Sequence, residues 1–514
     1  MCIGFLVIVN GQDQYKVVTT KSGPVKGQLE KTVWLEKPFY SFKGIPYAKP
    51  PVGELRFKPP EPVEAWSSPL DAFEYGNRCA QKFLIFSATS ENCLFLNIFV
   101  PALINEKENL PVIFIIHGGL FAVGSGEDRF YGPDFANEHD IILVTVNYRL
   151  GIFGFLSLGT PEYSGNMALK DQQMAMKWIH ENIEAFGGDK KRITMFGVSS
   201  GAQSHGFHLL NAESSKYFNQ QITISGTSNN IKSFKTGDHR CLMEIFYAKH
   251  NSGKPNTKNL IDFLQKAEVE DILNFNKQAI NGFISPWTPI VEKKNAKKPF
   301  FTEDPMKTFQ KTKSISKATL FGSAQYEHLY FIRGSNYSKP QVIDAFLKDF
   351  HIGLPIFGYY TTIWKKPNYL EGVLHEIKEY YFGKATNDHE RVIQRLILDS
   401  DITYSYFQEK WMEQHVAISK KDTFYTRFSV STKINPHEIK AAAHADELCY
   451  LFRCNKLIDY YKQIKANNKH DPDSSEILQV MNNMQSLYYN FVKYGTPIHD
   501  GKPIREFKPV QQSS

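Results

Sequence analysis

Short apolar runs alternate along the chain with stretches whose apolar residues recur at roughly helical spacing. The runs that read as buried strands are 111–116 (PVIFII), 141–146 (IILVTV), 192–196 (RITMF), 221–224, 319–321 and 423–430. The main helical pattern covers residues 168–185. Strands separated by helices predict an α/β fold, with a mostly parallel central sheet and helices on both faces. Parallel sheets place ligand sites at the carboxyl ends of their strands.

A GxSxG motif follows the strand predicted at 192–196. Residues 197–201 read GVSSG, and helix-compatible residues continue over 202–210. A serine at a sharp strand-to-helix turn exposes its hydroxyl, and the flanking glycines make room for the close approach of the backbone. The motif therefore makes Ser199 a candidate nucleophile. The alternative is a serine in an ordinary glycine-rich turn.

A second glycine loop follows the strand predicted at 111–116. In esterases, backbone N–H groups of such a loop, here Gly118, Gly119 and Leu120, donate to the oxyanion of the tetrahedral intermediate. Nucleotide-binding loops are the competing class. However, GxxxxGK does not occur, and the GSG at 124–126 does not complete GxGxxG. The loop therefore favours acyl transfer over a dinucleotide or P-loop site.

Composition sets limits on this picture. The chain has 514 residues, of which 42% are hydrophobic, and no linker, low-complexity tract or repeat divides it. We therefore expect residues 12–514 to form a single domain. The net charge is +7 with the signs interspersed, and the densest basic run, KKNAKK at 293–298, contains no aromatic residue. This run predicts a solvated loop and no nucleic-acid partner.

The N-terminus and the cysteines bear on localisation. The apolar run at 2–9 resembles the hydrophobic part of a signal peptide, which predicts a signal peptide over residues 1–11 and secretion. That run is too short for a bilayer span, which needs about 20 residues, and no other stretch predicts a transmembrane helix. In an oxidising compartment, Cys79 and Cys93 would close a 15-residue ring worth roughly 3 kcal/mol, whereas the sequence leaves the pairing of Cys241, Cys449 and Cys454 open. The sequon at Asn336 is a predicted glycosylation site.

Longer segments extend these motifs over nearly the whole chain. They are FKGIPYAKPPVGELRFKPP (42–60), ENCLFLN (91–97), HGGLF (117–121), NYRLGIFGFLS (147–157), GNMALKDQQ (165–173), ENIEAFGGD (181–189), FGVSSGA (196–202) and AAHADELCYLF (442–452). In this combination the chain resembles the type-B carboxylesterase/cholinesterase family, and it is most similar to insect-type carboxylesterases. The resemblance implies the α/β-hydrolase fold and a serine esterase that cleaves small-molecule esters without a metal or organic cofactor.

The resemblance also assigns roles. Ser199 would be the nucleophile, Glu327 in GSAQYEHLYF (322–331) the acid, and His444 the base. The chain order Ser…Glu…His is that of α/β-hydrolases. Outside these motifs, the glutamate would be read as a surface charge and the histidine as a hydrogen-bonded bystander. The backbone N–H groups that would form the oxyanion hole are those of Gly119, Leu120 and Ser200.

The same resemblance implies three pairs of residues that stabilise the fold. They are a disulfide, Cys79–Cys93, and two buried ion pairs, Arg56–Glu91 and Arg149–Asp171. His205 and His208 share a helix face near the candidate nucleophile. A metal pair is one interpretation, but i, i+3 histidines without a third ligand favour packing.

Several positions depart from the family pattern. Leu120 replaces the third glycine of HGGG, Val198 and Ser200 turn the usual GESAG into GVSSG, and His328 replaces a glycine of the acid motif. The chain also ends before the strand and helix with which family members usually finish, so we expect a C-terminally short domain. These departures leave open a weakly active or inactive protein that binds or sequesters hydrophobic esters. Adhesion proteins of this fold are disfavoured, because they usually lack a triad member.

The substrate class is partly predicted. In cholinesterases a Trp inside the N-terminal disulfide loop stacks on the choline cation, but residues 80–92 contain no Trp. Without this cation–π platform, selective hydrolysis of choline esters is not expected. Trp287 aligns roughly with the family's acyl pocket and would either line the substrate pocket or pack in the core. We expect neutral carboxylic esters, in xenobiotic, hormone or odorant turnover.

Overall fold

The computed structural model describes residues 13–82, 89–102, 109–230, 232–279, 285–332, 336–350, 367–467 and 471–498. The signal peptide predicted at 1–11 lies outside the described residues.

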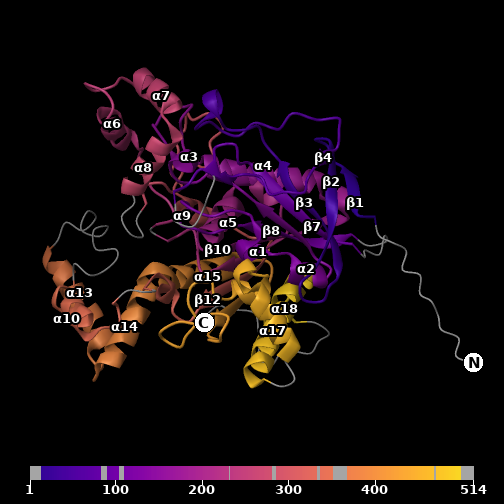
Figure 1. Cartoon of the computed structure of the whole chain (residues 1–514). Coiled ribbons are helices and arrows are strands. Elements are labelled where there is room, and N and C mark those ends of the chain that lie inside the picture. The colour runs from indigo at the N-terminus through magenta and orange to yellow at the C-terminus, as the bar shows by residue number, and fades with distance from the viewer. Residues whose placement is uncertain are drawn as a thin grey trace, which may run out of the picture.

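Apolar runs build an 11-stranded sheet at the centre of the molecule (Figure 1). Its strands are β1 (Tyr15–Thr19), β2 (Pro24–Lys31), β3 (Pro38–Pro46), β4 (Leu70–Asp71), β7 (Phe95–Pro101), β8 (Leu110–Ile116), β9 (Ile142–Val146), β10 (Gly188–Val198), β11 (Gln220–Ile224), β12 (Ala318–Ala324) and β13 (Thr423–Phe428). Their order is β1-β2-β3-β7-β9-β8-β10-β11-β12-β13, with β4 paired to β2. A separate pair joins β5 (Arg78–Cys79) to β6 (Thr89–Ser90).

The sheet has a parallel part and an antiparallel part. Neighbours from β9 to β13 are parallel, whereas β1, β2, β3, β7 and β9 pair antiparallel. The six strands predicted from apolar runs all lie in the parallel part, so that prediction is confirmed. Among the antiparallel strands, β1 gives no such signal because four of its five residues are exposed, whereas β7 was missed although six of its seven residues are buried.

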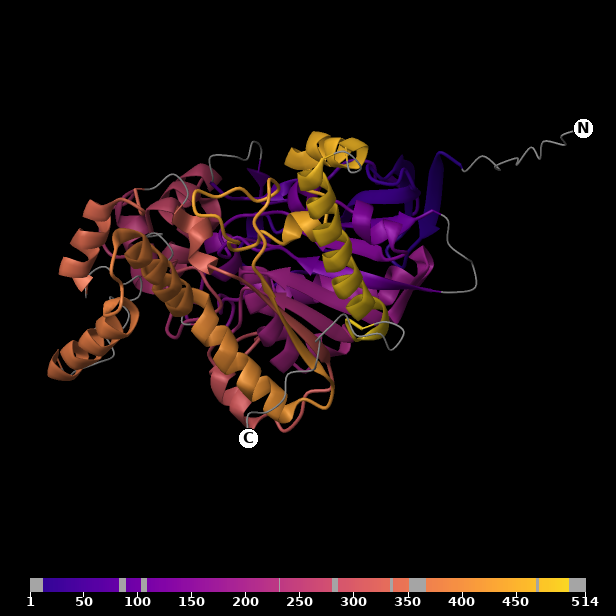
Figure 2. The same cartoon turned by 90° about the horizontal axis from the view of Figure 1, so that it is seen from below.

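Helices cover the sheet on both faces (Figures 1 and 2). They are α1 (Asp128–Tyr131), α2 (Asp134–Glu138), α3 (Gly151–Phe155), α4 (Met167–Asn182), α5 (Ser200–Leu210), α6 (Arg240–Ala248), α7 (Thr257–Lys266), α8 (Val269–Ala279), α9 (Pro305–Lys311), α10 (Pro340–Lys348), α13 (Pro367–Phe382), α14 (Asp388–Ser400), α15 (Tyr406–Ile418), α16 (Leu448–Leu451), α17 (Ile458–Asn467) and α18 (Pro472–Tyr494). None of the described helices combines the length and apolar character that crossing a membrane requires.

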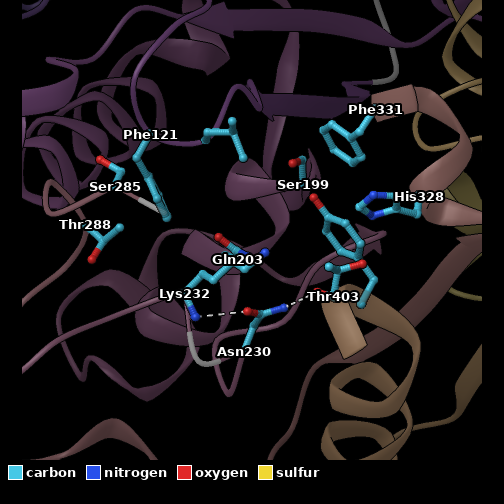
Figure 3. Close-up of a pocket in the computed structure, with 12 residues that line it drawn as sticks. Phe121, Ser199, Gln203, Asn230, Lys232, Ser285, Thr288, His328, Phe331 and Thr403 are labelled. Carbon is cyan, nitrogen blue, oxygen red and sulfur yellow. Dashed lines mark hydrogen bonds between the residues drawn. The ribbon is translucent and has the colours of Figure 1, made fainter. Parts of the chain in front are cut away.

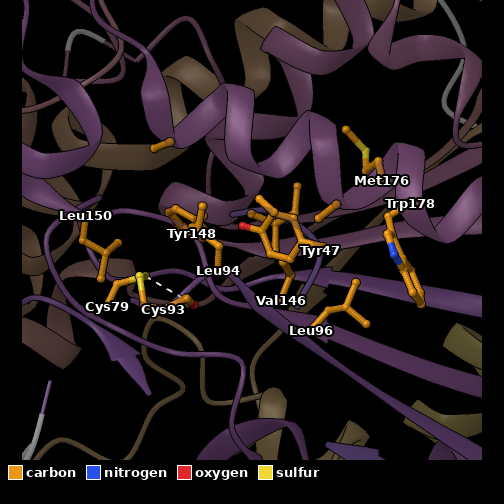
Figure 4. Close-up of a cluster of buried hydrophobic side chains, with 14 of the residues drawn as sticks. Tyr47, Cys79, Cys93, Leu94, Leu96, Val146, Tyr148, Leu150, Met176 and Trp178 are labelled. Carbon is orange, nitrogen blue, oxygen red and sulfur yellow. Dashed lines mark hydrogen bonds between the residues drawn. A yellow bond between two sulfur atoms is a disulfide. The ribbon is translucent and has the colours of Figure 1, made fainter. Parts of the chain in front are cut away.

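Side chains alternate between two core clusters along β8. Val112, Phe114 and Ile116 join the cluster that includes residues of α4, such as Met176 and Trp178 (Figure 4). Ile113 and Ile115, pointing the other way, join the cluster built with α18, which lies across that face of the sheet (Figure 2). This period of two is what a strand buried on both faces requires.

One long rod of helix contacts the segment after β12 at its middle and ends beside Ile315, which precedes β12. Helices α14 and α15 are continuous through η5 (Asp401–Ser405), a π-helical turn (Figure 2). A π turn adds a residue to the helical register and occurs frequently at functional sites. It therefore re-aims the side chains of this segment relative to those of a regular helix.

The pairs implied by the family resemblance are present. Cys79 and Cys93 form a disulfide (Figure 4). Arg56 Nε donates to Glu91 at 2.7 Å, and Arg149 Nη2 donates to Asp171 at 2.6 Å, so both ion pairs are confirmed. A second disulfide, Cys449–Cys454, was not predicted, because the segment between its cysteines matches no motif, while Cys241 is free and exposed.

Candidate active site

Ser199 lies at the turn between β10 and α5. Its backbone angles (φ 59°, ψ −127°) belong to a region that L-residues rarely adopt, as expected at a strained strand-to-helix turn. A Cβ added at Gly201 would lie 2.1 Å from the carbonyl oxygen of Ile116, on the neighbouring strand. A Cβ added at Gly197 would lie 2.7 Å from the backbone of Gly201. The glycines of the motif are therefore required by the contact between this turn and the sheet.

The loop after β8 packs directly against this turn. A Cβ at Gly118 would lie 2.6 Å from Val198 O and 3.0 Å from Ser199 Cβ. Gly119 and Leu120 both have positive φ (125° and 57°), and no hydrogen bond within the described part of the chain uses their N–H groups. The third expected oxyanion donor is the N–H of Ser200. This residue is the first of α5, where N–H groups have no acceptor within the helix. All three remain available to an acceptor from outside the chain.

Side chains from neighbouring segments hold this loop. Gln81 exchanges two hydrogen bonds of 2.8 Å with the backbone of Gly124, one through each end of its amide. Tyr148 Oη donates to His117 O at 2.7 Å, and the two rings stack with their centroids 4.3 Å apart. Because Gln81 follows Cys79 by two residues, the disulfide and the loop are mechanically connected.

His444 and Glu327 are joined by a short hydrogen bond between His444 Nδ1 and Glu327 Oε2, 2.7 Å long. The other carboxylate oxygen, Oε1, accepts from Ser225 Oγ at 2.8 Å and from the backbone N–H of Ala324 at 2.7 Å. Both partners are buried. These bonds fix the carboxylate, which in turn fixes the imidazole and leaves its Nε2 as the ring atom available for proton transfer.

Tyr404 connects the serine with the histidine. Its side chain interacts with that of Ser199, and its ring packs over the imidazole of His444 with centroids 4.6 Å apart. His444 Nε2 is buried and has no hydrogen-bond partner among the described residues. Burial raises the pKa of Tyr404, so its hydroxyl is neutral. Sequence reasoning missed Tyr404 because it lies in the π turn, where regular helical spacing does not apply.

A pocket with about 490 Å³ of empty space, part of it open to solvent, lies beside Ser199 (Figure 3). The residues that line it are Leu120, Phe121, Ser199, Gln203, Asn230, Lys232, Ser285, Thr288, His328, Phe331, Thr403 and Tyr404. The lining includes Ser285 and Thr288 but not Trp287, which is fully buried and packs against His239 at 4.8 Å between centroids. Of the two alternatives for this tryptophan, the structure gives core packing.

One wall of the pocket is charged, a feature that the sequence did not reveal. Burial lowers the pKa of Lys232 to about 8, against the opposing effect of the Asp399 carboxylate. The pKa of Asp399 is raised to about 6 by burial, so this carboxylate is ionised at neutral pH. Burial also lowers the pKa of His328 to about 3, which makes its ring neutral. The histidine that departs from the family pattern is therefore an uncharged part of the wall.

Other predicted positions lie away from this pocket. Asn336 is exposed, and the lysines of 293–298 are exposed in a loop. His205 and His208 are buried and hydrogen-bonded within the protein, to Thr223 Oγ1 at 3.0 Å and to Gln172 Oε1 at 2.8 Å, respectively. Burial lowers the pKa of each to about 3, which agrees with packing.

Comparison with known proteins defines the class. The model of the carboxylesterase family matches residues 14–513. The chain is 31% identical to juvenile hormone esterase of Tribolium castaneum, covering 94% of this chain and 84% of the relative, and 31% identical to para-nitrobenzyl esterase of Bacillus subtilis, covering 94% and 91%. The crystal structure of juvenile hormone esterase from Manduca sexta, with OTFP covalently attached, superimposes with a TM-score of 0.81 at 26% identity, covering 97% of this chain and 93% of that chain.

The fold and the site thus define an α/β-hydrolase. The chain belongs to the carboxylesterase family and is a carboxylic ester hydrolase that acts on small-molecule esters.

Proposed function

We propose that Ser199, His444 and Glu327 act as a Ser–His–Glu triad. The observation that carries this proposal is the 2.7 Å bond between His444 and Glu327, in a site where Tyr404 contacts both the histidine and the serine. The strained turn at Ser199 supports the same role, because it presents the hydroxyl at the carboxyl end of the parallel sheet.

The proposed reaction is acyl transfer in two steps. Ser199 gives its proton to His444 Nε2 and attacks the ester carbonyl. Glu327 holds the imidazole and stabilises its protonated form. His444 then protonates the leaving alcohol, and a water molecule, activated by the same nitrogen, cleaves the acyl-enzyme. The N–H groups that would hold the oxyanion are those of Gly119, Leu120 and Ser200.

The proposed substrate is a neutral carboxylic ester rather than a choline ester. The absence of tryptophan from the sequence between Cys79 and Cys93 supports the exclusion of choline. The name of the Tribolium castaneum relative supports hormone esters as the physiological class, with xenobiotic and odorant esters as further candidates. We further propose that the enzyme is secreted after removal of residues 1–11 and is glycosylated at Asn336, which the two disulfides and the exposure of this asparagine support.

The test is hydrolysis of p-nitrophenyl butyrate by the wild type and by Ser199→Ala. We expect steady turnover that the substitution lowers by about 10³-fold or more, because the nucleophile is lost. Ser204→Ala is the matched control, since Ser204 is a buried serine of α5 whose hydroxyl donates to Ser200 O at 3.0 Å, and it should keep turnover. Equal rates for Ser199→Ala and the wild type would refute the proposal.

A second candidate function is favoured by one observation. His444 Nε2 has no hydrogen-bond partner among the described residues, so the serine and the histidine are not joined in this structure, which favours a slow enzyme that binds or sequesters esters. The same assay separates the two functions. A single burst of p-nitrophenol, equal to the amount of protein and without turnover, identifies the sequestering protein.

A further inference from the structure

Gln203 lies on α5, four residues after Ser199, and the proposed reaction does not use its side chain. Its backbone N–H donates to Ser199 O at 2.8 Å, so the two residues lie one helical turn apart, about 6 Å along the helix axis. The Cα–Cβ bonds of an α-helix tilt toward its N-terminus, which directs the side chain of Gln203 back toward the nucleophile. Gln203 lines the pocket, and Figure 3 shows it near the centre of the lining residues. A substrate bound at Ser199 therefore lies beside this side chain.

The side-chain amide of Gln203 is unpaired within the protein. Its Oε1 and Nε2 form no hydrogen bond with any residue that the structure describes, although the backbone of Gln203 bonds to Ser199 and Ser228. The residue is only 8% exposed. A buried amide without a partner is unfavourable, because it has given up its hydrogen bonds to bulk water. A group from outside the chain must therefore pair with this amide when a ligand fills the pocket.

The other amide and aliphatic hydroxyl side chains of the lining, apart from the nucleophile, are bonded or enclosed. Asn230 accepts from a backbone N–H at 3.0 Å and donates to the carbonyl oxygen of Thr403, whose own hydroxyl donates to the backbone one turn earlier. Ser285 Oγ accepts from a backbone N–H at 3.1 Å. Thr288 Oγ1 has no hydrogen-bond partner within the described ranges of the chain, but this oxygen is fully enclosed. Gln203 therefore has the amide that a ligand can reach.

A carboxamide is suited to neutral oxygen groups. Its Nε2 donates two hydrogen bonds and its Oε1 accepts, while the group itself carries no charge. An ether, ketone or hydroxyl oxygen of a substrate would accept from Nε2, whereas a hydrocarbon chain in the same place would leave the amide unpaired. Because Gln203 is one helical turn from Ser199, such an oxygen must lie only a few bonds from the ester carbonyl.

We propose that Gln203 makes the enzyme prefer esters that carry a second, neutral oxygen group close to the ester bond, with Nε2 donating to that oxygen. This proposal rests on Ser199 as the nucleophile, and it refines the expectation of neutral esters: alkyl esters react, and oxygen-bearing esters of the same shape react better. Gln203 is a specificity-determining residue in this account and takes no part in bond making.

The experiment uses two pairs of esters in which an ether oxygen replaces one methylene group. The acyl pair is p-nitrophenyl 3-methoxypropanoate and p-nitrophenyl pentanoate, and the alcohol pair is 2-methoxyethyl butyrate and n-butyl butyrate. Within each pair, the ratio of kcat/KM values, ether over alkyl, is compared between the wild type and Gln203→Met, so that the intrinsic reactivity of the esters cancels. We expect the substitution to lower this ratio by about 3–10-fold in the pair whose ether oxygen reaches the amide, the effect of one neutral hydrogen bond.

Gln485→Met is the matched control. Gln485 is a buried glutamine of α18 that donates to Tyr450 O at 3.1 Å and does not line the pocket, so its substitution should leave both ratios unchanged. Gln203→Leu is a second apolar variant, which should lower the same ratio and replaces Gln203→Met if that protein does not fold.

A lower ratio in at least one pair supports the proposal and identifies the end of the substrate that lies beside Gln203. Ratios that stay unchanged in both pairs, including an equal loss for the two esters of a pair, overturn it. Failure of the proposed nucleophile is recognised separately, because it would appear as turnover that survives in Ser199→Ala.

Discussion

At the residue scale, Tyr404 lies beside both the serine and the histidine. Its ring packs over the imidazole of His444, with centroids 4.6 Å apart, and its side chain interacts with Ser199. A serine hydroxyl that donates to the tyrosine could not donate to His444 at the same time, because a hydroxyl has one proton. An interaction of Ser199 with Tyr404 therefore competes with the reactive arrangement.

We predict that Tyr404→Phe raises kcat/KM for p-nitrophenyl butyrate by about 2–10-fold, the range expected for the removal of one competing neutral hydrogen bond. Tyr330→Phe is the matched control, since the Tyr330 ring also contacts His444, at 6.2 Å between centroids, but is partly exposed. It should leave kcat/KM unchanged. A lower rate in Tyr404→Phe would mean that the tyrosine hydroxyl assists the reaction instead.

The sequence predicted the residues that carry motifs and missed those that tertiary structure brings in. Ser199, Glu327 and His444 stand in recognisable segments, so their numbers could be read directly. Lys232 and Tyr404 enter the pocket from a turn and from a π-helical segment. Neither position has a local pattern, because the π register and the path of a turn are set by packing rather than by spacing.

At the element scale, the turn between β10 and α5 leaves no space for a side chain at Gly201. A Cβ there would lie 2.1 Å from Ile116 O and 3.0 Å from the backbone of His117. These are backbone atoms of the strand and loop beside the site, which cannot move as a flexible side chain can.

We therefore predict that Gly201→Ala lowers the free energy of unfolding by about 1–3 kcal/mol, as overpacking does, and also lowers turnover by displacing Ser199. Gly372→Ala in α13 is the control, since a Cβ there meets nothing within 4 Å. It should be neutral or stabilising by up to about 1 kcal/mol, because alanine favours helix. Denaturant unfolding followed by tryptophan fluorescence measures both. Equal stability of the two variants would show that the turn can relax.

At the scale of the whole molecule, a buried ion pair connects the segment after β9 to helix α4. Arg149 donates to both carboxylate oxygens of Asp171, at 2.8 and 2.6 Å, and to Lys58 O at 2.7 Å. Asp171 is fully buried, and burial raises its pKa. Removing the arginine would leave this carboxylate without its main partner.

We predict that Arg149→Met lowers the free energy of unfolding by about 3–5 kcal/mol, the usual effect of breaking a buried pair on one side. Lys190→Met, which breaks an exposed pair with Glu184, should change it by less than about 1 kcal/mol. Urea titration of the three proteins gives the comparison. A small decrease in the free energy of unfolding of Arg149→Met would mean that water or a neighbouring donor replaces the guanidinium.

The parallel part of the sheet was more predictable from the sequence than the antiparallel part and the second disulfide. Continuous apolar runs marked β8, β9 and β10, because strands buried on both faces need apolar side chains at every position. Strand β1 and the Cys449–Cys454 disulfide were missed, because an exposed strand and a short segment without a motif give no comparable signal.

The two hydrogen bonds between Gln81 and Gly124 attach a covalent ring to the backbone that faces Ser199. The disulfide at Cys79 and Cys93 is therefore connected to the glycine loop beside the reactive serine by the amide of Gln81, and a second connection runs from Arg78 to Glu127. Protein produced in a reducing cytosol would lack the covalent ring and should hold this loop less firmly. We therefore expect the measured catalytic rate to depend on whether the expression host allows this disulfide to form.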